Sequence, residues 1–91
     1  MSGIASNVGG YKLVSATGNV APISKKLLGI FVSASSSGTV TIYDSATTTT
    51  TTKVIDTVTL TAGTWYSIPV AFASGIYVVV GGTLSATFVF A

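Results

Sequence analysis

Five amino-acid types are missing from this 91-residue chain: cysteine, histidine, glutamate, arginine and glutamine. Without cysteine there can be no disulfide framework, no thiol nucleophile and no thiolate metal ligand. Zinc sites are built mainly from cysteine and histidine, and calcium sites need several carboxylates close together. The sequence therefore predicts neither a metal ion nor a cofactor, and its length fits one small domain.

Charged side chains are scarce. An ordinary domain of this length carries about 23 of them, whereas this chain has four lysines and two aspartates. They are Lys12, Lys25, Lys26, Lys53, Asp44 and Asp56. A surface made of hydroxyl groups, glycine and apolar atoms opposes contact only weakly, which favours self-association. The alternative is a monomer that its hydroxyl groups keep in solution.

The few charges also bear on partners and location. The lysines are scattered and the net charge is only +2, so we predict no nucleic-acid partner. Residues 57–91 carry no charge, but glycines, Pro69 and hydroxyl residues interrupt every apolar run well short of the roughly 20 residues of a membrane helix. The first residues lack the regions of a signal peptide. We expect a soluble protein with no membrane partner, made in the cytoplasm without an export signal.

Short runs rich in Val, Ile, Thr, Tyr and Phe recur along the chain, separated by Gly, Ser, Asn or Pro. This pattern is typical of β-strands. Ser35–Gly38 and Gly81-Gly82 are predicted as turns between strands. The predicted strands are Tyr11–Ala16, Leu27–Ser35, Thr39–Asp44, Lys53–Leu60, Thr64–Ile68, Ile76–Val80 and Thr83–Phe90.

Turn signals every 8–12 residues predict an all-β fold, an antiparallel β-sandwich or jelly-roll-like domain of about seven or eight short strands. This domain covers residues 11–91, and residues 1–10 are a flexible arm or one that pairs with a partner. In the predicted strand Lys53–Leu60, Asp56 falls on the face that otherwise carries the apolar side chains. A bulge near Ile55-Asp56 would explain this.

Residues 47–52 are an unbroken run of six threonines. The run has β-propensity but no hydrophobic alternation, so we predict an exposed hairpin tip. Asp44 and Lys53 could form an ion pair across its base. The tip is either a contact loop or a tolerated low-complexity loop. As a contact loop it would use Thr47, Thr48, Thr49, Thr50, Thr51 and Thr52.

The last two predicted strands are apolar on both faces, which is unusual for a sheet with one wet face. The candidate interface residues are Tyr77, Val79, Phe88, Val89 and Phe90. They contact a partner, or they are buried centrally in the domain. With so few charges on the chain, we expect an interface.

Few residues could carry chemistry. Asp44 and Asp56 would form a carboxylate dyad if their strands pair, but neither lies in a signature motif, so we predict no enzyme. Trp65-Tyr66 is a candidate sugar-stacking pair. Because neighbouring residues in a strand point to opposite faces, only one of the two can be outside. A core role for either side chain is the alternative.

The segment Lys53-Val-Ile-Asp-Thr-Val-Thr-Leu-Thr-Ala-Gly-Thr-Trp-Tyr-Ser-Ile-Pro-Val-Ala-Phe continues into Ser74-Gly-Ile-Tyr-Val-Val-Val-Gly-Gly-Thr. It resembles small β-rich virion proteins of tailed bacteriophages, among them head decoration (cement) proteins. The resemblance covers roughly residues 25–91, and its centre is the pattern Gly-Thr-Trp-Tyr…Pro…Phe…Gly-Ile-Tyr-Val.

The resemblance implies a β-sandwich or jelly roll without catalysis. It also implies a location on the virion surface, self-association at capsid symmetry axes, often as a trimer, and contact with the major capsid protein or another virion protein. It transfers no site residues, and the threonine run lies outside the pattern. The alternatives are a tail or fibre component, or a carbohydrate-binding adhesin module that uses Trp65 or Tyr66.

Overall fold

The computed structural model describes residues 10–91. All regular structure among them is β-strand, as predicted, and every strand pair is antiparallel. The strands are β1 (Gly10–Val14), β2 (Gly18–Ala21), β3 (Lys25–Asp44), β4 (Lys53–Thr59), β5 (Thr64–Phe72) and β6 (Ile76–Phe90). Residues 1–10, predicted to be a flexible or partner-pairing N-terminal segment, lie outside the described residues except for Gly10, which pairs with Phe90.

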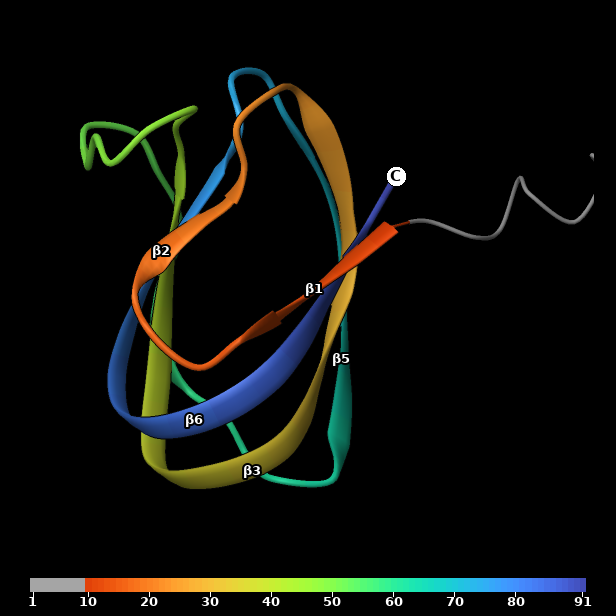
Figure 1. The fold of residues 1–91 in the computed structure, drawn as a ribbon, viewed down its shortest axis with the longest axis vertical. Coiled ribbons are helices and arrows are strands. Elements are labelled where there is room, and N and C mark those ends of the chain that lie inside the picture. The colour runs from red at the N-terminus through yellow and green to blue at the C-terminus, as the bar shows by residue number, and fades with distance from the viewer. Residues whose placement is uncertain (1–9) are drawn as a thin grey trace, which may run out of the picture.

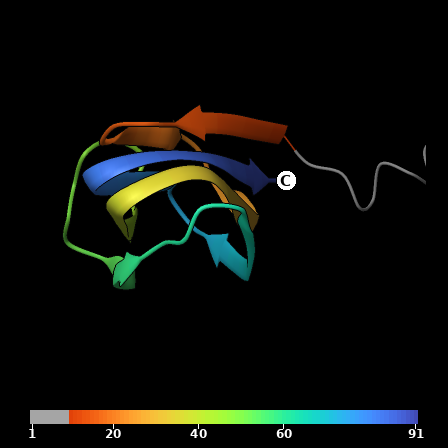
Figure 2. The same cartoon turned by 90° about the horizontal axis from the view of Figure 1, so that it is seen from below.

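Strands β3 and β6 are the spine of one six-stranded sheet. Strands β1 and β2 pair with opposite ends of β6, and β5 and β4 pair with opposite ends of β3. The sheet therefore has two four-stranded halves. We call β1-β6-β3-β5 the first arm and β2-β6-β3-β4 the second arm. Figure 2 shows β1, β6, β3 and β5 following one another across the curved sheet.

Both spine strands bend near their middle, so that the two arms face each other (Figure 1). The register between β3 and β6 shifts twice between residues 32 and 39, and Ser37 has a positive φ of 55°. Gly82, with a φ of 68°, allows the matching bend in β6. The turns predicted at Ser35–Gly38 and Gly81-Gly82 are thus corrected to kinks inside continuous strands. This leaves six strands where the sequence predicted seven or eight.

The core lies on the concave side of the bent sheet. Between Leu84 and Phe90, even-numbered residues point inward and odd-numbered ones outward. Both arms contribute to one cluster, because fully buried Ile30 and Phe88 come from the first arm and Ile42 from the second. The cluster is Val14, Val20, Ala21, Leu27, Ile30, Val32, Val40, Ile42, Leu60, Phe72, Ile76, Val78, Leu84, Ala86 and Phe88.

The detailed register agrees with the sequence in some places only. The predicted bulge in β4 is confirmed, because Val40 pairs with Val58 whereas Ile42 pairs with Ile55, which leaves one extra residue beside Asp56. Gly18 and Asn19 follow the predicted strand Tyr11–Ala16 and begin β2, a strand that the sequence did not predict. Strand β2 pairs with the first residues of β6, nearly sixty positions away, so no local pattern indicates it.

Candidate functional site

The five residues predicted as an interface on β6 do not share one face. Phe88 is fully buried, and Phe90 points to the same inner side and packs against the core. Tyr77, Val79 and Val89 point outward, but Tyr77 is only 8% exposed. The prediction is therefore corrected for Phe88 and Tyr77, which lack the free surface that a partner needs. Val79, Val89 and Phe90 are half-buried.

The outer face of the second arm is closed by contacts within the chain. The rings of Tyr43 and Tyr77 lie 6.2 Å apart. Thr41, only 7% exposed, shares a hydrogen bond of 2.6 Å with the hydroxyl group of Thr57. Buried polar groups with partners of this kind stabilise the fold.

The outer face of the first arm is more open, because four large apolar side chains protrude from it. They are Tyr11 (75% exposed), Leu13 (60%), Phe31 (43%) and Trp65 (50%). The strand register arranges the outer side chains in two rows across four strands. One row is Leu13, Thr87, Phe31 and Trp65, and the next is Tyr11, Val89, Gly29 and Ser67. We call this surface, defined by Tyr11, Leu13, Phe31, Trp65 and Val89, the apolar face.

Trp65 and Tyr66 point to opposite sides of β5, as predicted. The Trp65 ring lies against Gly29, where an added Cβ atom would come within 2.5 Å of Cη2. Tyr66 packs against the core, and its hydroxyl oxygen accepts a hydrogen bond of 2.9 Å from the backbone N–H of Thr61. The core alternative is right for Tyr66 and wrong for Trp65, which is part of the apolar face.

Tyr11, Leu13 and Phe31 were not among the residues that the sequence indicated. The only local signal is that Tyr11 and Leu13 flank Lys12 in an alternating run. Their role depends on β1 pairing with the last strand, which brings them beside Phe31 and Trp65. Because these pairings join distant parts of the chain, a reading of local patterns does not find the face.

The threonine run forms the tip of the β3–β4 hairpin, between the end of β3 at Asp44 and the start of β4 at Lys53. The predicted exposed tip is confirmed, because every residue of the run is exposed and none belongs to a strand. The β-propensity of threonine therefore does not extend the hairpin. The exposed residues are Thr47, Thr48, Thr49, Thr50, Thr51 and Thr52.

Contacts at the base hold the threonine loop at its first residues. The hydroxyl oxygen of Ser45 accepts hydrogen bonds of 3.1 Å from the backbone N–H groups of Thr47 and Thr49. The side-chain amide of Asn19 donates to the carbonyl oxygens of Ser45 and Thr47. These bonds fix where the loop leaves the sheet. A contact role for Thr48, Thr50, Thr51 and the rest of the run stays a prediction.

The predicted ion pair between Asp44 and Lys53 is wrong. Lys53 instead pairs with Asp56 at 3.2 Å, and the Asp44 carboxylate accepts hydrogen bonds from the consecutive backbone N–H groups of residues 73–75. The bond from Ser74 is the main cause that lowers the pKa of Asp44 below its ordinary 3.8. The backbone N–H of Thr57 does the same for the pKa of Asp56. Both carboxylates are thus kept ionised, whereas a general acid at neutral pH needs a raised pKa.

Asp44→Asn should lower the free energy of unfolding by about 1 kcal/mol at pH 7, because a neutral amide oxygen accepts the three N–H bonds less strongly at a partly solvated site. The folded-state pKa of Asp44 lies below its ordinary value. Its contribution is therefore present above the ordinary pKa and is lost as pH falls through the folded-state pKa. Urea unfolding of both proteins between pH 7 and about pH 2.5 should show the difference shrinking. A difference independent of pH would contradict this role for Asp44.

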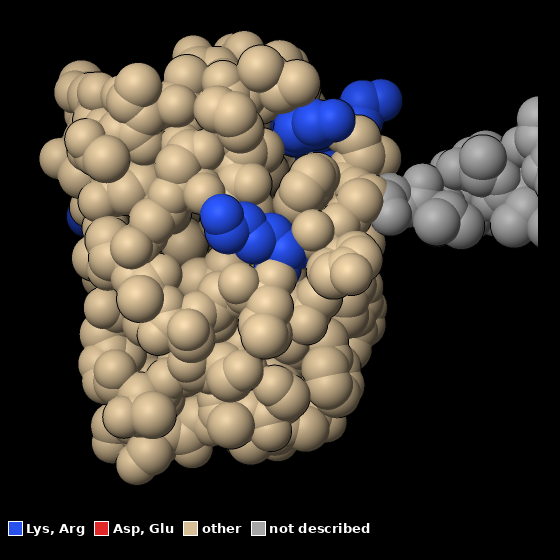
Figure 3. Space-filling model, viewed as in Figure 1, with Lys and Arg blue, Asp and Glu red and all other residues tan. Residues whose placement is uncertain are grey.

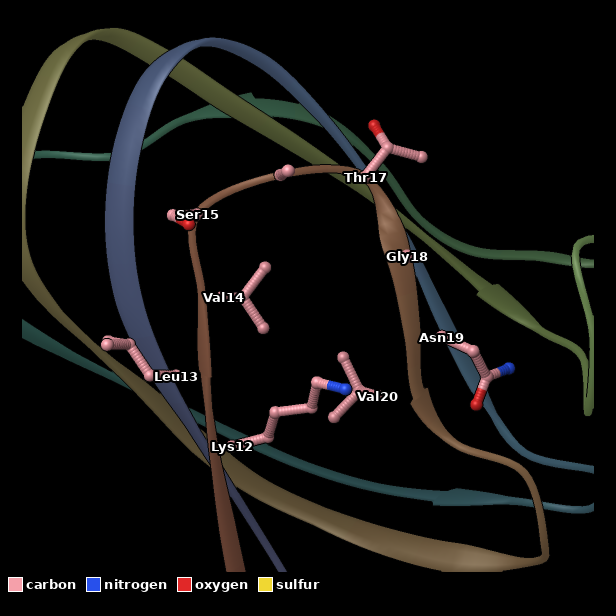
Figure 4. A pocket seen from close by; sticks show the side chains of 9 residues that line it. Lys12, Leu13, Val14, Ser15, Thr17, Gly18, Asn19 and Val20 are labelled. Atoms are coloured by element: carbon pink, nitrogen blue, oxygen red, sulfur yellow. The ribbon is translucent and has the colours of Figure 1, made fainter.

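A hollow of about 250 Å³ lies between β1 and β2, beneath the connection of residues 12–20. Figure 4 shows Val14 pointing into it and Lys12 running across it toward Val20. Leu13 points away from it. Lys12 is the only charged residue of its lining. In Figure 3 two of the basic side chains on this side of the molecule lie close together near the top, the others lie apart, and no acidic one is visible.

Within residues 10–91 no group of three or more His, Cys, Asp or Glu side chains is placed to hold a metal ion. The same residues contain no helix long and apolar enough to cross a membrane. Comparisons with protein-family models, with curated proteins and with solved structures gave no match. The features of the chain that bear on its function are therefore the apolar face and the scarcity of charge.

Proposed function

We propose that this chain is a non-enzymatic virion structural protein, a capsid decoration subunit that stabilises a phage head by packing against its own copies and the capsid. The observation that carries the proposal is the apolar face. A contiguous apolar patch of several hundred Å² is often functional and marks a site of association. The phage setting comes from the resemblance of residues 25–91 to decoration proteins.

The bent sheet supports the fold expected of such a subunit. Its two arms supply side chains to one core, in the manner of the two layers of a β-sandwich. We propose that the domain is a small sandwich whose layers are the two ends of the same long strands. Its outer faces then differ in role: the second arm is closed by its own contacts, and the first arm is left to meet other molecules.

A decoration role does not require strong individual contacts. A head presents many identical lattice sites, so modest individual contacts add up through avidity. A trimer is the form that the resemblance favours, with each subunit touching its neighbours and the major capsid protein. A tail or fibre component would associate through the same apolar face in another part of the virion.

A carbohydrate-binding adhesin is the second candidate, because half-exposed Trp65 lies against the sheet at Gly29, with Phe31 beside it. Aromatic rings of this kind can stack on sugars. However, a sugar site also needs well-placed polar groups that fix the ligand. The polar side-chain groups of the two rows are the hydroxyl groups of Tyr11, Ser67 and Thr87 and the indole N–H of Trp65, and none of them is a carboxylate or an amide.

The proposed function is tested by the solution mass of the purified chain and by sedimentation with phage heads. We expect light scattering after size exclusion to give a multiple of the 9.1 kDa chain, with three copies as the favoured value. The chain should also pellet with empty heads of its phage in excess over a lysozyme control. A monomer that stays in the supernatant would overturn the proposal.

A further inference from the structure

The apolar face is large enough to matter for association. Its four protruding side chains expose about 450 Å² together, taking roughly 200 Å² for a complete side chain. This is within the range of the largest apolar patch on a typical monomer, which is often functional. Half-buried Val89 and the exposed residues Ser67, Pro69 and Ala71 of β5 extend the surface. These residues enlarge the surface toward the ~800 Å² that each partner buries in a stable complex.

Charge is directed away from this face. Three of the six charged residues belong to the first arm: Lys12, Lys25 and Lys26. The Lys12 side chain runs toward Val20, on the other side of β1 from Leu13 (Figure 4). The ammonium group of Lys25 lies 5.9 Å from the ring centroid of inward-pointing Phe90. Only Lys26, near the start of β3, is an exposed charge at the margin.

We propose that a second copy of this chain covers the apolar face in solution, with Phe31 and Trp65 at the centre of the contact. The inference rests on the proposed function, since it names the surface through which the subunit self-associates. Two molecules of net charge +2 repel each other, and a contact through an uncharged face avoids placing like charges opposite one another. The small Thr87 between Leu13 and Phe31 leaves room for a facing side chain.

The chemistry of the face favours a copy over other occupants. A charged capsid surface would be met by complementary charge, and a sugar by amide, carboxylate or guanidinium groups. None of the eight residues in the two rows carries such a group. An uncharged apolar surface fits another uncharged surface, and most of the surface of a second copy is uncharged because the chain has only six charged residues.

Trp65 allows a direct test, because it is the only tryptophan in the chain. Its emission should move to shorter wavelength as the protein concentration rises, in step with the mass from light scattering, because the ring leaves water when the copies meet. If the mass rises while the emission stays constant, copies associate elsewhere and this inference fails, although the proposed function survives. If the mass stays at 9.1 kDa, self-association itself fails.

Substitution of the central side chain provides the second test. Phe31→Ser should raise the dissociation constant of the copies at least about 30-fold, because central aromatic residues contribute most to such contacts. Ile23→Ser is the matched control, since Ile23 is 59% exposed but lies outside the face, and it should leave association unchanged. Thermal unfolding of each variant verifies that it is folded. Equal dissociation constants for the two variants, or a Trp65 emission that responds to glycans and not to protein concentration, would overturn the inference.

Discussion

Phe88→Ala should lower the free energy of unfolding by about 3–5 kcal/mol, one of the largest losses expected from any single substitution in this chain. Phe88 is fully buried, and it pairs with Ile30 on one neighbouring strand and Lys12 on the other. Removing the ring leaves a cavity among side chains from both arms, which cannot close without moving the spine of the sheet. A domain of this size has only about 5–15 kcal/mol in total, so the variant should be close to unfolding.

Val89→Ala is the control for this prediction, because Val89 follows in the same strand but points outward and is half-buried. It should cost less than about 1 kcal/mol in urea unfolding followed by circular dichroism. The sequence alone predicted that both side chains contact a partner. If Phe88→Ala kept its stability and lost association, Phe88 would belong to an interface and not to the core.

Phe88 shows what local patterns can and cannot predict. Alternation along β6 gave the correct parity for Phe88 and Phe90. The alternation did not show which face of β6 is buried in the core. Burial depends on the bend that folds one half of the sheet over the other. A strand that is apolar on both faces can meet its own chain on one side and another molecule on the other. Sequence favoured the interface for Phe88, and the fold assigns it to the core.

The strand boundaries show a related limit. Short-range signals identified nearly all strand-forming segments. Ser35–Gly38 and Gly81-Gly82, however, have the residue types that are typical of turns. In an isolated hairpin they would reverse the chain, whereas here β3 and β6 stay paired on both sides of them and only bend. The apolar face follows from the same long-range pairing. Leu13 and Trp65 are 52 residues apart and meet in one row only because Thr87 and Phe31 lie between them.

Gly75→Ala should lower the free energy of unfolding by about 2–3 kcal/mol, because three backbone segments converge on this residue. An added Cβ atom would lie 2.7 Å from the carbonyl oxygen of Ser45 and 2.9 Å from the Cα atom of Ala46, and it would also meet the carbonyl oxygen of Ala21. Backbone atoms cannot rotate aside as the end of a flexible side chain can. The hydrogen bond of 3.1 Å from the Ser45 N–H to the Gly75 carbonyl oxygen would be strained as well.

Gly18→Ala is the matched control, since an added Cβ atom on Gly18 meets nothing within 4 Å. It should change the free energy of unfolding by no more than about 0.5 kcal/mol, because alanine restricts the unfolded chain at no cost in contacts. Urea unfolding of both variants gives the comparison. The close approach at Gly75 joins the end of β2, the base of the threonine loop and the turn into β6, three segments whose separate sequences do not indicate a meeting point. Equal stability of the two variants would mean that these segments are not packed together, and that the second arm is looser than the hydrogen bonds of Asn19, Asp44 and Ser45 imply.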